Sequence, residues 1–264
     1  MNSSEKQPIG IFDSGIGGTS IWKEIHSLLP NEQTIYLSDS FNAPYGQKSR
    51  QKILELSVKN TEFLLKQNCK IIVVACNTAT TNAIKYLRSS YDVPFIGIEP
   101  AIKPASILTK SKKIGILATK GTLNSELFEK TSSKIDQEVQ IIEQIGEGLV
   151  ELIESNQINS PKMDELLQRY LQPMLKEHVD CLVLGCTHYP YLIPKIKEIV
   201  GESLKIIDSG EAVARQTKNI LQQLNLLSPH PNSKENVFYI NKDKTVLLHI
   251  LKGHTNVNIV QKQF

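Results

Sequence analysis

Short apolar runs alternate with longer amphipathic stretches along this chain, and this alternation constrains the fold more than any other feature. Buried strands of parallel sheets read as continuous apolar runs, and the stretches between them supply covering helices. Ile53–Lys66 is one such stretch, because its apolar residues roughly follow the 3.6-residue repeat of a helix. The pattern therefore predicts an α/β fold with parallel sheets. The predicted strands are Ile9–Phe12, Thr34–Ser38, Ile71–Ala75, Phe95–Ile98, Lys113–Ala118, Val139–Glu143, Cys181–Gly185, Lys205–Asp208 and Asn236–Ile240.

The chain also resembles itself in two halves. Ile9–Asp13 and Ile114–Ala118 each open a strand–turn–helix unit. Each is followed, 65 and 70 residues later, by an apolar strand that ends in a small residue and a cysteine, Cys76 and Cys186. We predict two similar lobes, each a parallel-sheet α/β sandwich, with the active site in the cleft between them. The alternative, that α/β units look alike in general, stays open.

The expected lobes are not contiguous in the sequence. Residues 1–97 and 208–264 form the first predicted lobe, which carries Cys76, and residues 98–207 form the second, which carries Cys186. After Gly210 the sequence predicts a helix to about residue 226, a Ser/Pro/Asn-rich connector at 228–233 and a strand–helix–strand tail. That tail is too small to fold alone, so we expect it to pack on the first lobe.

Composition excludes several classes of protein. The 264 residues include 22% charged residues with a net charge of +3 and no Lys/Arg cluster, so nucleic acid is not an expected partner. The longest aliphatic run, Ile71–Ala75, is too short to span a membrane. The first residues lack the apolar segment of a secretory signal, so we expect a cytoplasmic protein. Four cysteines in a chain of this length do not indicate a disulfide scaffold.

The glycine-rich loop Asp13–Thr19 follows the first predicted strand. It lacks the G-x-G-x-x-G spacing of dinucleotide-binding loops, so no nucleotide cofactor is expected. We expect a tight turn whose N–H groups approach a small carboxylate, with the Ser14 hydroxyl beside them. The Asp13 side chain suits an ammonium group or a neighbouring thiol, and a helix N-cap is the alternative role.

The cysteines divide into two pairs. Cys76 and Cys186 each precede a predicted helix N-terminus, a setting that lowers a thiol pKa. Either alone would more often be a small buried apolar residue, but the repeated setting indicates a thiol pair. Cys69 and Cys181 stand at strand starts and are expected to be inert. The sequence has no C-x-x-C, so no metal is expected, and His188 would instead share a proton with Cys186.

Six segments together resemble the glutamate racemases of the cofactor-independent aspartate/glutamate racemase superfamily. They are Phe12–Gly18, Ala43–Gly46, Ala75–Ala79, Ile98–Ala101, Gly185–Pro190 and Asp208–Gly210. The resemblance implies that L- and D-glutamate are interconverted without metal or cofactor, which would supply D-glutamate for peptidoglycan. The resemblance thus implies glutamate as the small-molecule partner and a homodimer as a candidate assembly.

The same resemblance implies residue roles. Cys76 and Cys186 would be the acid/base thiols, with Asp13 and His188 as their helpers. The implied substrate contacts are Asp13, Ser14, Tyr45, Gly46, Asn77, Thr78, Thr119, Thr187 and His188. An assisting glutamate falls on Glu154, with Glu151 as the other candidate.

Racemisation chemistry agrees with a thiol pair. The Cα proton must leave one face of the amino acid while another arrives on the opposite face, and two thiols on opposing lobes meet that need. An amino-acid-binding protein would not need the thiols. A dithiol redox protein would need the sulfurs to approach to about 2 Å. Within the racemases, aspartate is the second candidate substrate, and the Pro44–Gly46 loop and Ser14 are expected to hold the distal carboxylate.

Overall fold

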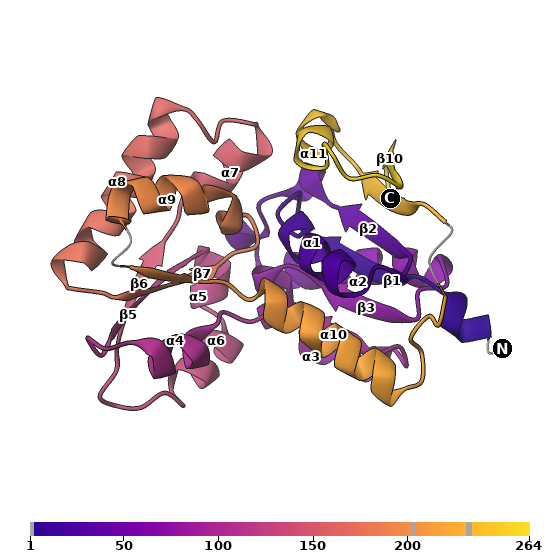
Figure 1. Ribbon diagram of the computed structural model, residues 1–264, viewed down its shortest axis with the longest axis horizontal. Coiled ribbons are helices and arrows are strands. Elements are labelled where there is room, and N and C mark those ends of the chain that lie inside the picture. The colour runs from indigo at the N-terminus through magenta and orange to yellow at the C-terminus, as the bar shows by residue number, and fades with distance from the viewer. Residues whose placement is uncertain (1–2, 202–203, 231–233) are drawn as a thin grey trace.

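A computed structural model describes residues 3–201, 204–230 and 234–264, and it contains two parallel sheets enclosed by helices (Figure 1). The six-stranded sheet has the order β10-β9-β2-β1-β3-β4, and the four-stranded sheet β6-β5-β7-β8. The strands of the first are β1 (Ile9–Asp13), β2 (Thr34–Ser38), β3 (Ile71–Val74), β4 (Phe95–Gly97), β9 (Asn236–Ile240) and β10 (Val257–Gln261); those of the second are β5 (Lys113–Ala118), β6 (Gln140–Ile145), β7 (Cys181–Gly185) and β8 (Lys205–Ile207). The prediction of two parallel-sheet α/β regions is confirmed.

Each sheet and its helices form one lobe. The first lobe contains α1 (Thr19–Leu28), α2 (Arg50–Lys66), α3 (Asn77–Ser90), α10 (Gly210–Gln223) and α11 (Thr245–Ile250), with the short 3-10 helices η1 (Ser3–Lys6), η2 (Ser40–Asn42) and η3 (Tyr45–Gln47). The second contains α4 (Ile102–Leu108), α5 (Lys120–Leu123), α6 (Glu126–Ser132), α7 (Leu149–Glu154), α8 (Pro161–Lys176), α9 (Ile193–Val200) and η4 (Tyr189–Leu192). No helix in these described ranges is both long and apolar enough to cross a membrane.

The first sheet is covered on both faces, which explains its unbroken apolar strands. Ile71 and Val73 join the apolar cluster that includes Trp22 of α1, whereas Ile72 and Val74 join a separate cluster with residues of α2 and α3. Successive side chains of a strand point to opposite faces, so α1 lies on one face and α2 and α3 on the other. Strands buried on both faces need apolar residues at every position.

Both ends of the sequence contribute to the first sheet. β9 pairs with β2 and β10 with β9, both in parallel, and α10 packs against α1. Trp22 on α1 and Phe238 of β9 pack edge to face, with 4.8 Å between ring centroids. The strand–helix–strand tail therefore packs as expected, although residues 231–233 of the predicted connector lie outside the described residues.

One predicted strand is displaced. Val139–Glu143 was expected, but β6 runs over Gln140–Ile145, because its pairing with β5 continues until Ala118 meets Ile145. β6 is an edge strand with mixed exposed and half-buried residues, so its apolar signal is weak.

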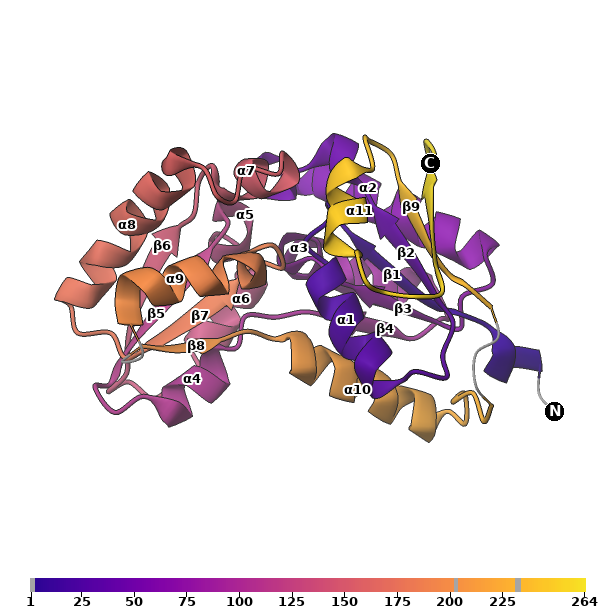
Figure 2. The same ribbon diagram turned by 45° about the horizontal axis from the view of Figure 1, so that its top comes forward.

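The chain passes between the lobes twice, after β4 and after β8. The two crossings run side by side in the lower half of both views, and α7 lies on the opposite, upper side of the junction (Figures 1 and 2). The Ser209 hydroxyl of the second crossing donates to the Glu99 carbonyl of the first at 2.5 Å. The crossings therefore form one connected strip, and the loops at the carboxyl ends of the strands meet above it.

Candidate active site

The two predicted thiols line one small cavity at the junction of the lobes. The predicted site residues that line it are Ser14, Tyr45, Gly46, Cys76, Asn77, Thr78, Thr119, Cys186, Thr187 and His188, together with Pro44, Val150 and Gly185. Asp13 is fully buried beside them. The structure thus brings together residues from both halves of the sequence, as expected for loops at the carboxyl ends of parallel strands.

Cys76 follows β3 and is the N-cap of α3. Its Sγ accepts a hydrogen bond from the Ala79 N–H at 3.4 Å and lies 3.7 Å from the Ser14 hydroxyl. Burial, and next the Asp13 carboxylate, raise the pKa of Cys76 well above its usual range, although Ala79 and Ser14 act in the opposite direction. The expected lowering at a helix N-terminus is therefore outweighed in this closed cavity, because an ion without water is costly.

Cys186 follows β7 in the second lobe. Its Sγ lies 3.8 Å from Nδ1 of His188, and Nε2 of that ring lies 2.6 Å from Oε1 of Glu154. Burial alone would lower the pKa of His188, but the interactions with Cys186 and Glu154 outweigh burial and raise it well above the usual value. Cys186 therefore has a partner that can carry a proton, and Glu154 stabilises the charged form of that partner.

Asp13 ends β1 and is held by its own loop. Its Oδ2 accepts from the N–H groups of Gly18 at 2.8 Å and Gly15 at 3.3 Å, and Thr187 Oγ1 of the other lobe lies 3.4 Å from Oδ1. Burial raises the pKa of Asp13, partly offset by His188 and by the Gly18 N–H. Asp13 thus organises the glycine loop beside Cys76.

The glycine loop was expected to approach a small ligand carboxylate, but its N–H groups have protein partners. Ile16 N donates to Glu154 Oε1 at 2.6 Å, and Gly17 N lies 3.2 Å from His188 Nε2. A Cβ at Gly15 would lie 1.9 Å from Glu154 Oε1, and one at Gly17 would lie 2.2 Å from His188 Nδ1. The glycines therefore allow the two lobes to come close together.

The hydroxyl of Tyr45 is hydrogen-bonded within the first lobe. Its hydroxyl donates to Asp39 Oδ2 at 2.5 Å and accepts from the Asn60 amide at 3.1 Å. The hydroxyl therefore already has two partners, and the expectation that the Pro44–Gly46 loop holds the distal carboxylate stays a prediction. The tyrosine lines the cavity as a buried wall.

Asn77 is the polar side chain most clearly available to a ligand. It is 3% exposed, and its Oδ1 and Nδ2 have no hydrogen-bond partner among the residues that the structure describes. Buried amides are almost always hydrogen-bonded, so this one is suited to a polar ligand in the cavity. Beside it, the Thr78 hydroxyl lies 2.9 Å from that of Thr119 across the lobe junction.

The cavity is closed as the structure stands. Its volume is about 10 Å³, room for a single water molecule. Cys76 and Cys186 are 5% and 8% exposed. An amino acid can enter only after the lobes separate. Within the described ranges, no group of three or more His, Cys, Asp or Glu side chains is placed to hold a metal ion.

Comparison with known proteins identifies the family. A family model described as Asp/Glu/Hydantoin racemase matches residues 9–217. The chain belongs to this family. A glutamate racemase of Ectopseudomonas mendocina (strain ymp) is 47% identical over 232 residues, 88% of each sequence. The family resemblance found in the sequence is confirmed.

Solved structures of glutamate racemases have the same architecture. The crystal structure of the Bacillus anthracis isoform RacE1 superposes with a TM-score of 0.87 and 31% identity over 98% of both chains. The Escherichia coli glutamate racemase, solved with L-glutamate and the activator UDP-MurNAc-Ala, has a TM-score of 0.84 and 32% identity over 98% of this chain and 100% of that one.

Two features of this racemase-family site escaped the sequence analysis. Ser40 donates to Glu154 Oε2 at 2.7 Å, and Val150 forms part of the cavity wall. Ser40 lies in a polar loop at the carboxyl end of β2, a place where ligand-binding residues are common. Only the fold, however, places it against Glu154, which is 114 positions later in the sequence. The structure also separates the two candidate glutamates, since the Glu154 side chain is 6% exposed in the site whereas Glu151 is exposed and contacts Gln47.

Proposed function

We propose that this chain interconverts L- and D-glutamate and that Cys76 and Cys186 are its acid/base pair. The observation that supports this most is that two thiols, one from each lobe, line the same cavity at equivalent positions after buried strands. An amino acid held between them would present one face of its Cα to each sulfur. One thiolate would remove the proton while the other thiol delivers one, with the roles exchanged in reverse.

The groups around each sulfur support its task. Ser14 and the Ala79 N–H lie beside Cys76 and favour its thiolate, and His188 lies beside Cys186. The raised pKa of Cys76 refers to a cavity without substrate, where burial and Asp13 both oppose the thiolate. A substrate ammonium group near Asp13 would reduce that opposition.

The polar residues of the cavity suit the substrate's carboxylate and ammonium groups. Asn77 offers an unpaired amide, and we assign substrate contacts to Ser14, Thr78, Thr119 and Thr187 as well. Donors fixed in a cavity without water stabilise the charge that grows on the α-carboxylate as the proton leaves. Asp13, Gly46 and His188 complete the proposed contacts, and Tyr45 contributes its ring.

Glu154 is the proposed assisting glutamate. It contacts His188 directly and accepts hydrogen bonds from Ile16 and Ser40 of the first lobe. It can therefore stabilise a protonated His188 once the lobes have closed, a position that Glu151 does not share.

Glutamate is the proposed substrate because the relatives at 44–47% identity are glutamate racemases and one solved relative holds L-glutamate. We further propose that the D-glutamate serves peptidoglycan synthesis, consistent with the muramic acid derivative that activates the same relative. Rescue of a D-glutamate auxotroph by this chain would support that role, and growth only with added D-glutamate would contradict it.

The direct test is circular dichroism of purified protein with L- or D-glutamate, and with both enantiomers of aspartate as controls. Both glutamate enantiomers should converge on the racemate. Aspartate is one methylene shorter than glutamate, so its distal carboxylate would be misplaced in the site. Its kcat/KM should therefore be lower than that of glutamate by roughly 10-fold or more. An equal or higher value for aspartate would transfer the assignment to that amino acid.

A further inference from the structure

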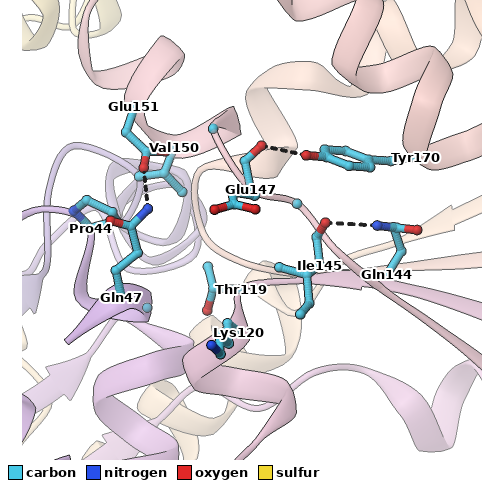
Figure 3. Close-up of a pocket in the computed structure, with 13 residues that line it drawn as sticks. Pro44, Gln47, Thr119, Lys120, Gln144, Ile145, Glu147, Val150, Glu151 and Tyr170 are labelled. Carbon is cyan, nitrogen blue, oxygen red and sulfur yellow. Dashed lines mark hydrogen bonds between the residues drawn. The ribbon is translucent and has the colours of Figure 1, made fainter. Parts of the chain in front are cut away.

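A larger pocket adjoins the closed cavity. It has a volume of about 360 Å³ and shares Pro44, Gly46, Thr119 and Val150 with the cavity wall. Figure 3 shows it between η3 of the first lobe and the segment that leads into α7 of the second. Because the cavity cannot hold an amino acid as it stands, this neighbouring pocket is the place from which a substrate would reach it.

One hydrogen bond spans the rim of this pocket from lobe to lobe. Nε2 of Gln47 on η3 donates to Oε1 of Glu151 on α7 at 2.6 Å, and both side chains are exposed (Figure 3). The bond lies by α7, on the side of the junction opposite the two chain crossings (Figures 1 and 2). If the crossings act as a hinge, separation of the lobes is largest there, so this bond must break when the site opens.

Helix α7 links the rim to the site. Glu151 and Glu154 are three positions apart on this helix, so they lie on neighbouring parts of one face. Glu151 reaches Gln47 at the rim, and Glu154 reaches Ile16 and Ser40 inside. The segment before α7 is fixed by the Tyr170 and Tyr189 hydroxyls, which donate to the carbonyls of Glu147 and Gly146 at 2.8 and 3.1 Å.

We propose that the 360 Å³ pocket is the vestibule through which the amino acid reaches the buried thiols, and that the Gln47–Glu151 hydrogen bond is the latch that keeps it shut. The vestibule carries charges of both signs, Lys120 on one wall and Glu147 on another, which suits a zwitterionic amino acid. The identity of that ligand rests on the proposed function, whereas the latch does not.

The accessibility of Cys76 and Cys186 to a thiol reagent tests the latch without requiring catalysis. The wild-type protein and the variants Gln47→Leu, Glu151→Leu and Gln47→Leu/Glu151→Leu are treated with iodoacetamide in the absence of substrate, and the alkylation of each cysteine is followed by mass spectrometry. We expect Cys76 and Cys186 to react about 2- to 10-fold faster in each single variant, the range that one exposed hydrogen bond supports. The double variant should be no faster than the single ones.

The chain offers matched controls. Glu147→Gln removes a charge from the same pocket while leaving the Gln47–Glu151 bond in place, so it should label like the wild type. Cys69 and Cys181 are buried elsewhere, so their labelling reports general loosening. Unchanged rates at Cys76 and Cys186, or a rise at all four cysteines together, would overturn the latch. Protection of Cys76 and Cys186 by L-glutamate is a separate test of the proposed function.

Discussion

At the scale of single residues, the two site thiols differ in their surroundings. Cys76 has a hydroxyl, an N–H group and a buried carboxylate nearby, whereas Cys186 has an imidazole linked to Glu154. Each lobe therefore supplies one sulfur together with its own polar neighbours.

Serine substitution tests whether both thiols are needed. Cys76→Ser and Cys186→Ser keep the shape nearly unchanged but replace a thiol with a far weaker acid. Each should lower kcat/KM by roughly 10²- to 10⁴-fold or more in both directions. Circular dichroism in each direction provides the measurement. Cys69→Ser and Cys181→Ala are the controls and should keep nearly full activity, so a Cys186→Ser enzyme of normal rate would sink the assignment.

The charge state of His188 provides a second test at this scale. Burial favours the neutral ring, and Cys186 and Glu154 raise the pKa against it. Glu154→Gln should therefore shift the His188 titration to lower pH, so that the ring loses its proton earlier as the pH rises. The titration can be followed through the NMR signals of the C–H groups of the His188 ring. Glu151→Gln should leave it unchanged, and a shift in that control alone would reverse the roles of the two glutamates.

The sequence revealed residues by their local setting but not their distant partners. Cys76, Cys186 and Asp13 could be singled out because each directly follows a strand predicted from the sequence. The partners of the glycine loop were not, since Ile16 bonds to a residue 138 positions away and Gly17 to one 171 positions away. The sequence likewise did not show that Asp39 accepts a hydrogen bond from the Tyr45 hydroxyl.

At the scale of elements, long or fully buried segments were predictable and short ones were not. β1, β2, β3 and β7 are buried at every position, and each lies within one residue of its prediction. α7 has only six residues, which is too short for an apolar repeat to mark it in the sequence. It begins directly after Gly148, whose φ is +81°. Yet α7 carries both Glu151 and Glu154, which is why the sequence could not separate them.

A buried ion pair joins the ends of several elements of the first lobe. Lys70 Nζ lies 2.6 Å from Glu32 Oε2 and also donates to the carbonyls of Glu5 and Leu226, each at 2.8 Å. Both charged side chains are almost fully buried. The pair thus connects the start of β3 to the segments before β1, before β2 and after α10.

Removing one partner should leave the other charge buried and uncompensated. Lys70→Met is expected to lower the free energy of unfolding by about 3–5 kcal/mol. The exposed pair Lys52–Glu55, at 3.3 Å, serves as control, and Lys52→Met should cost less than about 1 kcal/mol. Urea denaturation gives the free energy of unfolding of both variants. An equal loss of stability in Lys70→Met and Lys52→Met would show that the buried pair does not hold these segments together.

At the scale of the whole molecule, the site exists only where the lobes meet. Hydrogen bonds from the first lobe reach Glu154 and His188, and the Thr78 and Thr119 hydroxyls meet across the same junction. The internal similarity of the sequence indicated two lobes with one thiol each, but not how closely they shut. The cavity of about 10 Å³ is too small for an amino acid, so we expect substrate binding to begin with an opening step.

The most direct test of the two-thiol account is the fate of the Cα hydrogen in deuterated water. L-Glutamate is incubated briefly with the enzyme, and both enantiomers are separated and analysed by mass spectrometry. If each thiol serves one face, the D-glutamate should carry solvent deuterium at Cα from the first turnover, while unreacted L-glutamate keeps its original hydrogen. Early D-glutamate that retained the original hydrogen would show that one base serves both faces, and it would contradict the account.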